Sequence, residues 1–201
     1  VYEPEIIHSE EFDASHLQFI NQSLAELDRR VRDLGGRLTF RAGSLPDVLS
    51  VLHSDHGIDA IWSHEETGNK ITYDRDLRVA AWVKQQGIPW KETPQNGVVR
   101  RLKSRDGWSK QRDAFLKQPM ADASTKLSHP SGVTPGRLQT PKDLGLSPTI
   151  KSRLQQGGEK AATETLRSFL FERGQNYSGE MSSPVTAADS CSRLSTYLAW
   201  G

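Results

Sequence analysis

The chain is poor in the features that define several large classes of protein. Its 201 residues include a single cysteine, Cys191, which excludes an internal disulfide framework and fits a cytoplasmic location. No stretch approaches the run of about 18 apolar residues that a membrane-spanning helix needs, so no membrane partner is expected. The formal net charge is only +1, so the chain as a whole offers no electrostatic attraction to nucleic acid.

Glycine-rich phosphate loops are also absent. None of the predicted strands is followed by the glycine pattern of a dinucleotide-binding or P-loop site. The sequence therefore predicts no phosphate site of either kind, and an α/β fold alone would not establish a function.

The first half does contain an alternation of helical and strand patterns. Six apolar residues at helical spacing predict a long helix: Leu17, Ile20, Leu24, Leu27, Val31 and Leu34. Ser15 is the predicted cap of this helix, and Gly35 and Gly36 end it. The further predicted elements are the tail of a strand at 1–2, a strand at 37–42, a helix from Pro46 to about Gly57, a strand at 58–63, a helix at 73–86 and a strand at 88–93.

This order of elements predicts the fold class. Strands joined through helices of this length run parallel, with right-handed crossovers. The expected fold is therefore α/β, with a doubly wound parallel sheet of the Rossmann-like kind. Ligands of such sheets bind at the carboxyl ends of the strands, so the loop at 65–72 is the expected crevice. Trp62, Trp82 and Trp90 are expected in the core.

The pattern changes after Pro94. Five prolines with interspersed serine and glycine mark a long connector, inside which a short helix is predicted at 108–116. Helices are predicted again at 148–156 and 158–173. The predicted organisation is an α/β domain at 1–95, an interdomain connector at 96–147 and the beginning of a helical domain at 148–201.

The closing segment, Ser190 to Ser195, concentrates polar side chains directly before an apolar run at 197–201 that is expected to be helical. A helix start carries unpaired N–H groups and a partial positive charge, which suit a phosphate group. On these residues alone, a serine cluster that only caps the helix is the more common explanation.

Other candidate sites are weaker. Cys191 has no histidine near it in the sequence, so it is interpreted as a small apolar residue and not as a nucleophile. His53 and His56 lack a third metal ligand. The basic stretch at 100–112 is interpreted as a solvated loop, and the alternative is contact with nucleic-acid phosphates, with Trp108 stacking on a base.

Two sets of residues resemble the photolyase/cryptochrome family in order and spacing. The C-terminal set comprises the run 157–162, Leu166, Phe169, Leu170, Tyr177, Pro184, the run 191–195, Tyr197, Leu198 and Gly201. The N-terminal set comprises Arg75, Asp76, Val79, Gly107, Trp108 and Phe115. The resemblance covers nearly the whole chain, but it corresponds only to the N-terminal part of a full-length family member. It implies an N-terminal fragment, with the family's first strand and helix preceding Val1.

The resemblance implies a flavoprotein that uses blue or near-ultraviolet light. In a deoxyribodipyrimidine photolyase, which is a lyase, light-excited reduced FAD passes an electron to a cyclobutane pyrimidine dimer in DNA, and the dimer splits. The implied partner is damaged DNA, contacted by the full-length protein, and a monomer is expected. The α/β domain would be of the antenna type, with a chromophore of unspecified identity, and 148–201 would open the FAD-binding domain. The fragment alone is expected to be inactive.

The family's cofactor residues correspond to six positions of this chain, and no catalytic residue or metal ligand is implied. Tyr177 matches a tyrosine that contacts the flavin. Cys191, Ser192, Arg193, Leu194 and Ser195 match a Thr-Ser-Arg-Leu-Ser segment that holds the FAD phosphates, with the cysteine in place of threonine.

Two further departures concern the other ligands of the family. Met181 stands where many microbial photolyases carry an arginine that touches DNA. The Asn-Glu pair that binds a folate antenna in some members is not found beside Arg75 and Asp76. The identity of the antenna chromophore therefore stays open.

Two alternative functions stay open. One is a cryptochrome-type blue-light photoreceptor without repair activity. The other is an isolated α/β module that binds only a nucleotide-like chromophore. Photolyases and cryptochromes differ mainly in residues that would follow Gly201.

Overall fold

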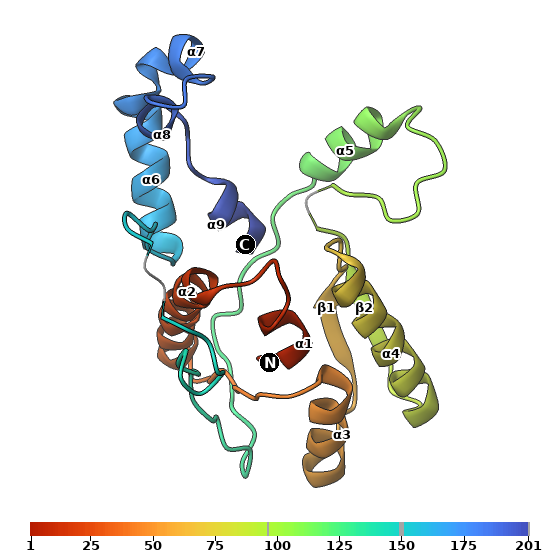
Figure 1. The fold of residues 1–201 in the computed structure, drawn as a ribbon. Helices are drawn as coiled ribbons and strands as arrows, with labels where there is room; N and C mark the ends of the chain where they lie inside the picture. The colour runs from red at the N-terminus through yellow and green to blue at the C-terminus, as the bar shows by residue number, and fades with distance from the viewer. Residues whose placement is uncertain (96, 149–150, 201) are drawn as a thin grey trace. The chain divides into compact units, whose positions relative to one another are not determined.

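The computed structural model describes residues 1–95, 97–148 and 151–200. The chain forms two compact units, each composed of several stretches of sequence (Figure 1). Unit 1 comprises Val1–Ser9, Thr39–Lys126 and Pro130–Gly136, and unit 2 comprises Glu10–Leu38, Leu127–His129 and Arg137–Gly201. The domain boundaries predicted from the sequence stay a prediction.

Unit 1 is a mixed α/β unit with parallel strands. Its elements are α1 (Pro4–Ile7), α3 (Leu45–His56), β1 (Ile61–His64), α4 (Lys70–Gln86), β2 (Trp90–Thr93) and α5 (Trp108–Leu116). β1 and β2 pair in parallel, with Ile61 opposite Trp90 and His64 opposite Thr93. A separate parallel bridge joins Tyr2 to Ala42. The wider doubly wound sheet stays a prediction.

The strand predicted at 37–42 is wrong for most of its length, since only Ala42 takes part in a bridge. The backbone groups of this segment have other partners. The Leu38 N–H donates to the Asp28 carboxylate at 2.9 Å, and the Phe40 N–H donates to the Pro135 carbonyl at 2.7 Å. These bonds replace the ladder that alternating apolar residues would otherwise form.

The predicted helices of unit 1 are confirmed, and each end has a local cause. Pro46 lies in the first turn of α3, where its missing N–H costs nothing. The Asn69 side chain caps α4 by accepting from the Thr72 N–H at 3.2 Å, so this helix begins three residues earlier than predicted. Gly87 ends α4 in the left-handed conformation, at φ 69°.

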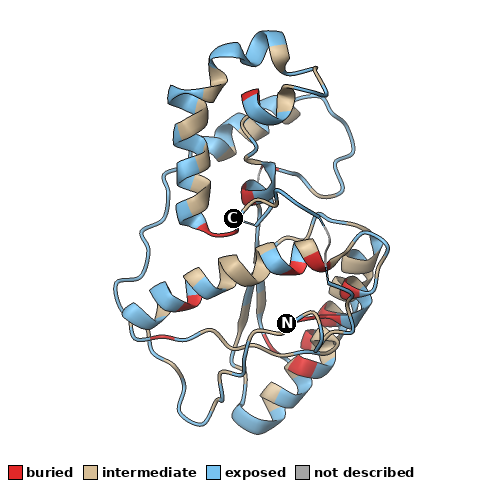
Figure 2. Cartoon of the chain, turned by 60° about the vertical axis from the view of Figure 1, so that its left-hand side comes forward, coloured by how far each residue is buried: buried red, intermediate tan, exposed pale blue. Residues whose placement is uncertain are grey.

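The core of unit 1 lies between α4 and the strands. Val79, Val83 and Ile88 are buried there, and Trp82 and Trp90 pack against them, as predicted. In Figure 2 the buried positions of the chain are red, and most of the helix surface is half-buried or exposed. Trp62 contradicts the prediction, because 70% of it is exposed. Alternate residues of a strand face opposite sides, and Trp62 lies on the side of β1 away from its half-buried neighbours Ile61 and Ser63.

Unit 2 is helical. Its elements are α2 (Ala14–Asp33), α6 (Glu159–Phe171), the 3-10 helix η1 (Arg173–Asn176), α7 (Tyr177–Glu180), α8 (Ala187–Ser190) and α9 (Ser195–Trp200). The long helix predicted from apolar spacing is α2, but its cap is Asp13 and not Ser15. The Asp13 carboxylate accepts from the Ser15 N–H at 2.7 Å, which places Ser15 inside the helix.

The short helix predicted at 148–156 is wrong for residues 151–156, and its positions 149–150 lie outside the described residues. Polar groups of this stretch and of Gly157 bind other parts of unit 2. The Gln155 amide donates to the Arg193 carbonyl at 2.8 Å, and the Gly157 N–H donates to the Gln22 side chain at 2.8 Å. Among the described helices, none is long and apolar enough to cross a membrane.

Candidate functional site

The closing segment, residues 190–195, is a non-helical link between two short helices of unit 2. Ser190 is buried at the end of α8, and its hydroxyl donates to the Glu180 carboxylate. Cys191 leaves the helix in an extended conformation, and Ser195 is the first residue of α9. Ser190 therefore has a structural partner, and the Cys191 N–H has one too, since it donates to the Ala187 carbonyl at 2.9 Å.

The hydrogen-bond donors of residues 192–195 are unused within the part of the chain that is described. Neither the N–H groups of residues 192–195 nor the hydroxyls of Ser192 and Ser195 bond to another described residue. Arg193 is exposed and has a left-handed backbone, at φ 59°. A left-handed residue turns successive N–H groups toward one side, which makes a concavity that suits an anion.

The carbonyl groups of the segment, in contrast, are occupied. Arg173 donates from its guanidinium to the Cys191 carbonyl at 2.7 Å and to the Ser192 carbonyl at 3.4 Å. The Arg193 carbonyl accepts from Gln155. The segment thus presents donors and one cation, with few free acceptors, and this composition fits a phosphate or pyrophosphate group.

The other predicted cofactor residues have ordinary packing roles as well. Tyr177 begins α7, and its ring packs edge-on against Phe169, with the centroids 5.8 Å apart. η1, α7 and α8 contact one another, so Tyr177 and Cys191 belong to one helical cluster. Leu194 lines an apolar groove, and the Cys191 thiol is half-buried. The cofactor role of all six residues stays a prediction.

The apolar groove of unit 2 has a cavity volume of about 410 Å³ and lies between α2, α6 and α9. Tyr197 fixes α9 beside it, because its hydroxyl donates to the Gln156 carbonyl at 2.8 Å and its ring lies 5.3 Å from that of Phe19. Leu27 and Leu198 leave the groove open, with 47% and 65% of their surface exposed. The groove adds apolar surface beside the donor-rich segment.

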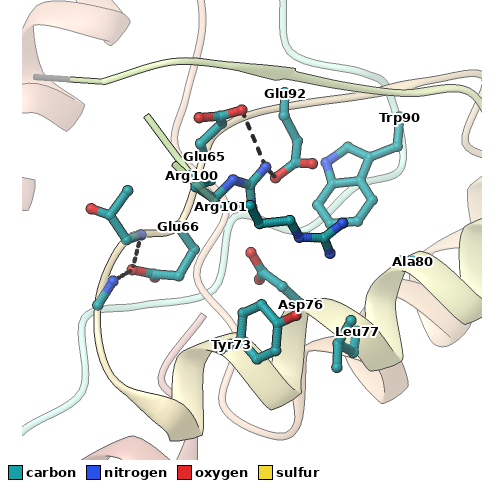
Figure 3. A pocket seen from close by; sticks show the side chains of 12 residues that line it. Glu65, Glu66, Tyr73, Asp76, Leu77, Ala80, Trp90, Glu92, Arg100 and Arg101 are labelled. Atoms are coloured by element: carbon teal, nitrogen blue, oxygen red, sulfur yellow. Dashed lines mark hydrogen bonds and ion pairs between the residues drawn. The ribbon is translucent and has the colours of Figure 1, made fainter. Parts of the chain in front are cut away.

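A second hollow, of about 580 Å³, lies in unit 1 where β1 and β2 end (Figure 3). It includes residues 65–68, which belong to the loop predicted as the crevice. Its walls combine carboxylates with two arginines, and Tyr73 and Trp90 add aromatic surface. Arg100 donates to Glu92 at 2.7 Å and lies 3.4 Å from Glu65.

Acidic groups of this hollow are held in defined positions. One oxygen of Glu66 accepts from the N–H groups of Thr67 and Gly68, at 2.9 and 2.7 Å. Burial raises the pKa of Asp76 above its usual range, although the guanidinium of Arg75 opposes this shift. A ligand here would need a donor for the carboxylates and a planar group for the aromatic walls.

The basic stretch at 100–112 is partly engaged within unit 1. Arg100 pairs with the carboxylates of the hollow, and Arg112 pairs with Asp113 at 2.7 Å. The Arg112 guanidinium also lies 5.1 Å from the centroid of the Trp108 ring. His53, a weak candidate for a metal ligand by sequence, accepts the Ile58 N–H at 3.0 Å.

The family model of DNA photolyase matches residues 1–129, which is more than half of the chain. The chain belongs to the DNA photolyase family. This match confirms the resemblance found in the sequence, and the parallel α/β arrangement of unit 1 lies within the matched residues. The photolyase/cryptochrome family is thereby established for the chain.

Curated relatives include a protein named as a cryptochrome and one named as a blue-light photoreceptor. Cryptochrome DASH of Gloeobacter violaceus is 29% identical over 202 residues, covering 92% of this chain and 40% of its own length. The blue-light photoreceptor PHR2 of Arabidopsis thaliana is 26% identical over 208 residues, covering 92% of this chain and 46% of its own. The chain thus spans less than half of either relative.

Solved structures of the family share the fold. The Synechocystis sp. PCC6803 cryptochrome has a TM-score of 0.73 at 19% identity, covering 98% of this chain and 45% of that one. A class III photolyase of Agrobacterium tumefaciens scores 0.67 at 20% identity, with coverage of 98% and 43%. An archaeal photolyase of Sulfolobus tokodaii with two FAD molecules scores 0.70 at 21% identity, with coverage of 100% and 44%.

Sequence reasoning missed one residue of the site. Arg173 holds the closing segment through its carbonyl groups, but it lies 18 positions before Cys191 in the chain. An arginine at the end of an amphipathic helix ordinarily faces solvent. The sequence therefore contains no local signal that this arginine binds the carbonyl groups of the segment.

Proposed function

We propose that the protein containing this chain is a light-dependent DNA repair enzyme, a photolyase that splits cyclobutane pyrimidine dimers. The observation that carries the proposal is the donor-rich segment at 192–195, which fits the pyrophosphate of FAD. Membership of the DNA photolyase family and the fold shared with a class III photolyase support it. When bound, reduced FAD supplies the light-excited electron.

The residues of this chain would bind and orient that cofactor. Ser192 and Ser195 would donate hydrogen bonds to the phosphate oxygens, and the guanidinium of Arg193 would offset their charge. Cys191 would not replace the family's threonine as a donor, because a thiol is a poor donor and the Cys191 N–H already donates to the Ala187 carbonyl at 2.9 Å. Tyr177 would contact the flavin, and Leu194 would belong to the segment that holds the phosphates.

Further properties belong to the same proposal. Damaged DNA would be the partner of the full-length protein, which would be a cytoplasmic monomer. An antenna chromophore would occupy unit 1, and the hollow where β1 and β2 end is the candidate site. The S. tokodaii photolyase, whose two FAD molecules imply a novel light-harvesting cofactor in that protein, supports an antenna of some kind in this fold.

A cryptochrome-type photoreceptor without repair activity is the second candidate. Two observations favour it: relatives of the chain are named as cryptochromes and as a blue-light photoreceptor, and Met181 replaces an arginine that touches DNA in many microbial photolyases. Both candidates use the same flavin site, so the residues at 191–195 do not distinguish them.

A repair assay separates the two candidates. The full-length protein, with its flavin reduced, is mixed with DNA that contains a thymine dimer and is illuminated with blue light. We expect the dimer to disappear in the light and to persist in an identical sample kept dark. Persistence of the dimer in both samples, with flavin bound and reduced, would favour the photoreceptor.

A further inference from the structure

We propose that Arg173 is a positioning residue that sets the direction of two phosphate-binding N–H groups, those of Ser192 and Arg193. The inference rests on the proposed function, because it assumes that the segment holds the pyrophosphate of FAD. It adds a residue outside the segment whose side chain controls the segment's shape.

The guanidinium of Arg173 donates to five groups of unit 2. Its Nε donates to the Ser168 hydroxyl at 2.6 Å. The terminal nitrogens donate to the carbonyls of Asp189 at 3.0 Å, Cys191 at 2.7 Å, Ser192 at 3.4 Å and Thr165 at 3.2 Å. α6 thus fixes the arginine through Ser168 and Thr165, and the arginine fixes the end of α8 and the two residues that follow it.

The geometry of the peptide bond connects these contacts to the donors. In a trans peptide the C=O of one residue and the N–H of the next point in opposite directions. Because Arg173 holds the carbonyls of Cys191 and Ser192, the N–H groups of Ser192 and Arg193 point away from it. Gln155 holds the Arg193 carbonyl in the same manner, which directs the Leu194 N–H.

Three successive N–H groups are therefore oriented before any ligand arrives. Preorganised donors bind an anion more strongly, because ordering them costs nothing at the moment of binding. A lysine could not replace Arg173, since one ammonium group lacks the planar fork that spans several carbonyls. If Arg173 only stabilised the fold of unit 2, its replacement would weaken the binding of every ligand of the site equally.

The test compares a flavin that has the pyrophosphate with one that lacks it. Apoprotein of the full-length wild type and of Arg173→Lys is titrated with FAD and with riboflavin, and the melting temperature is measured in parallel. We expect the Kd for FAD to rise about 10–100-fold, the effect of losing roughly one charge-assisted hydrogen bond, while the Kd for riboflavin changes less than about twofold. Amide hydrogen exchange of residues 190–195 should become faster in the variant.

Arg167→Lys is the matched control. Arg167 lies on α6, the helix that holds Arg173, is exposed, and has no bond to a carbonyl of the segment among the described contacts. We expect this variant to bind both flavins as the wild type does. Ser168→Ala is a milder probe if Arg173→Lys does not fold, because it frees only the Nε group, and a smaller rise in the FAD Kd is expected from it.

Two results would overturn the positioning role: an unchanged Kd for FAD in the variants, or an equal loss of FAD and riboflavin. If the wild-type protein bound FAD no more tightly than riboflavin, the assignment of the phosphate site would be wrong. The proposed role of Arg173 would then be wrong as well. The riboflavin titration keeps these failures apart.

Discussion

Arg75→Met is expected to lower the free energy of unfolding by about 3–5 kcal/mol, the usual cost of leaving buried charges without their partner. Arg75 lies on α4, and its side chain is only 14% exposed. It donates to three carboxylates: Glu3 at 2.6 Å, Asp76 at 2.7 Å and Glu66 at 3.1 Å. Glu3 and Asp76 are themselves nearly buried, so water cannot replace the guanidinium.

Urea unfolding of the chain at neutral pH measures this loss, and Arg78→Met is its matched control. Arg78 lies on the same helix and pairs with Glu5, but both of these side chains are exposed by more than two fifths. Exposed ion pairs contribute little, because water and salt screen them. Equal losses in the two variants would contradict the account of Arg75 as the centre of a buried network.

The double variant Ser192→Ala/Ser195→Ala is expected to weaken FAD binding by the full-length protein at least about a hundredfold. Each hydroxyl would donate a hydrogen bond to an ionised phosphate, worth roughly 1.5–3 kcal/mol, and two such bonds correspond to at least that change in affinity. Neither hydroxyl has another partner among the described residues, so their removal leaves no protein group unsatisfied.

The flavin content of the purified protein, measured by absorbance, gives the first result, and titration of the apoprotein gives the Kd. Ser178→Ala/Ser182→Ala is the control, because it removes two exposed hydroxyls from unit 2 outside the segment. Flavin retention equal to that of the wild type in the Ser192/Ser195 variant would remove the assignment of the phosphate site.

Local patterns explain most of what the sequence predicts correctly. The apolar spacing from Leu17 to Leu34 predicts α2, and the glycines at 57 and 87 predict where α3 and α4 end. Both signals are local, because helix periodicity and helix ends depend on neighbouring residues. The cap of α2 is Asp13 and not the predicted Ser15. The sequence does not separate the two, since both residue types are good caps and they lie two positions apart.

Contacts between distant residues explain what the sequence could not predict. The segment at 37–42 has a strand pattern, but Asp28 and Pro135 take the N–H groups that a neighbouring strand would use. Burial of Trp62 depends on which side of β1 is covered, and the periodicity of one strand does not specify that. The contacts of Arg173 are of the same kind, because α6 and the closing segment meet only in three dimensions.

The most direct test of the central claim is a crystal structure of the full-length protein grown with FAD. The account predicts pyrophosphate oxygens within about 2.7–3.2 Å of the N–H and hydroxyl donors of residues 192–195, with Arg173 still bound to the carbonyls of Cys191 and Ser192. The account would be contradicted by a structure in which FAD is bound with its phosphates against other residues, while only water contacts the donors of residues 192–195.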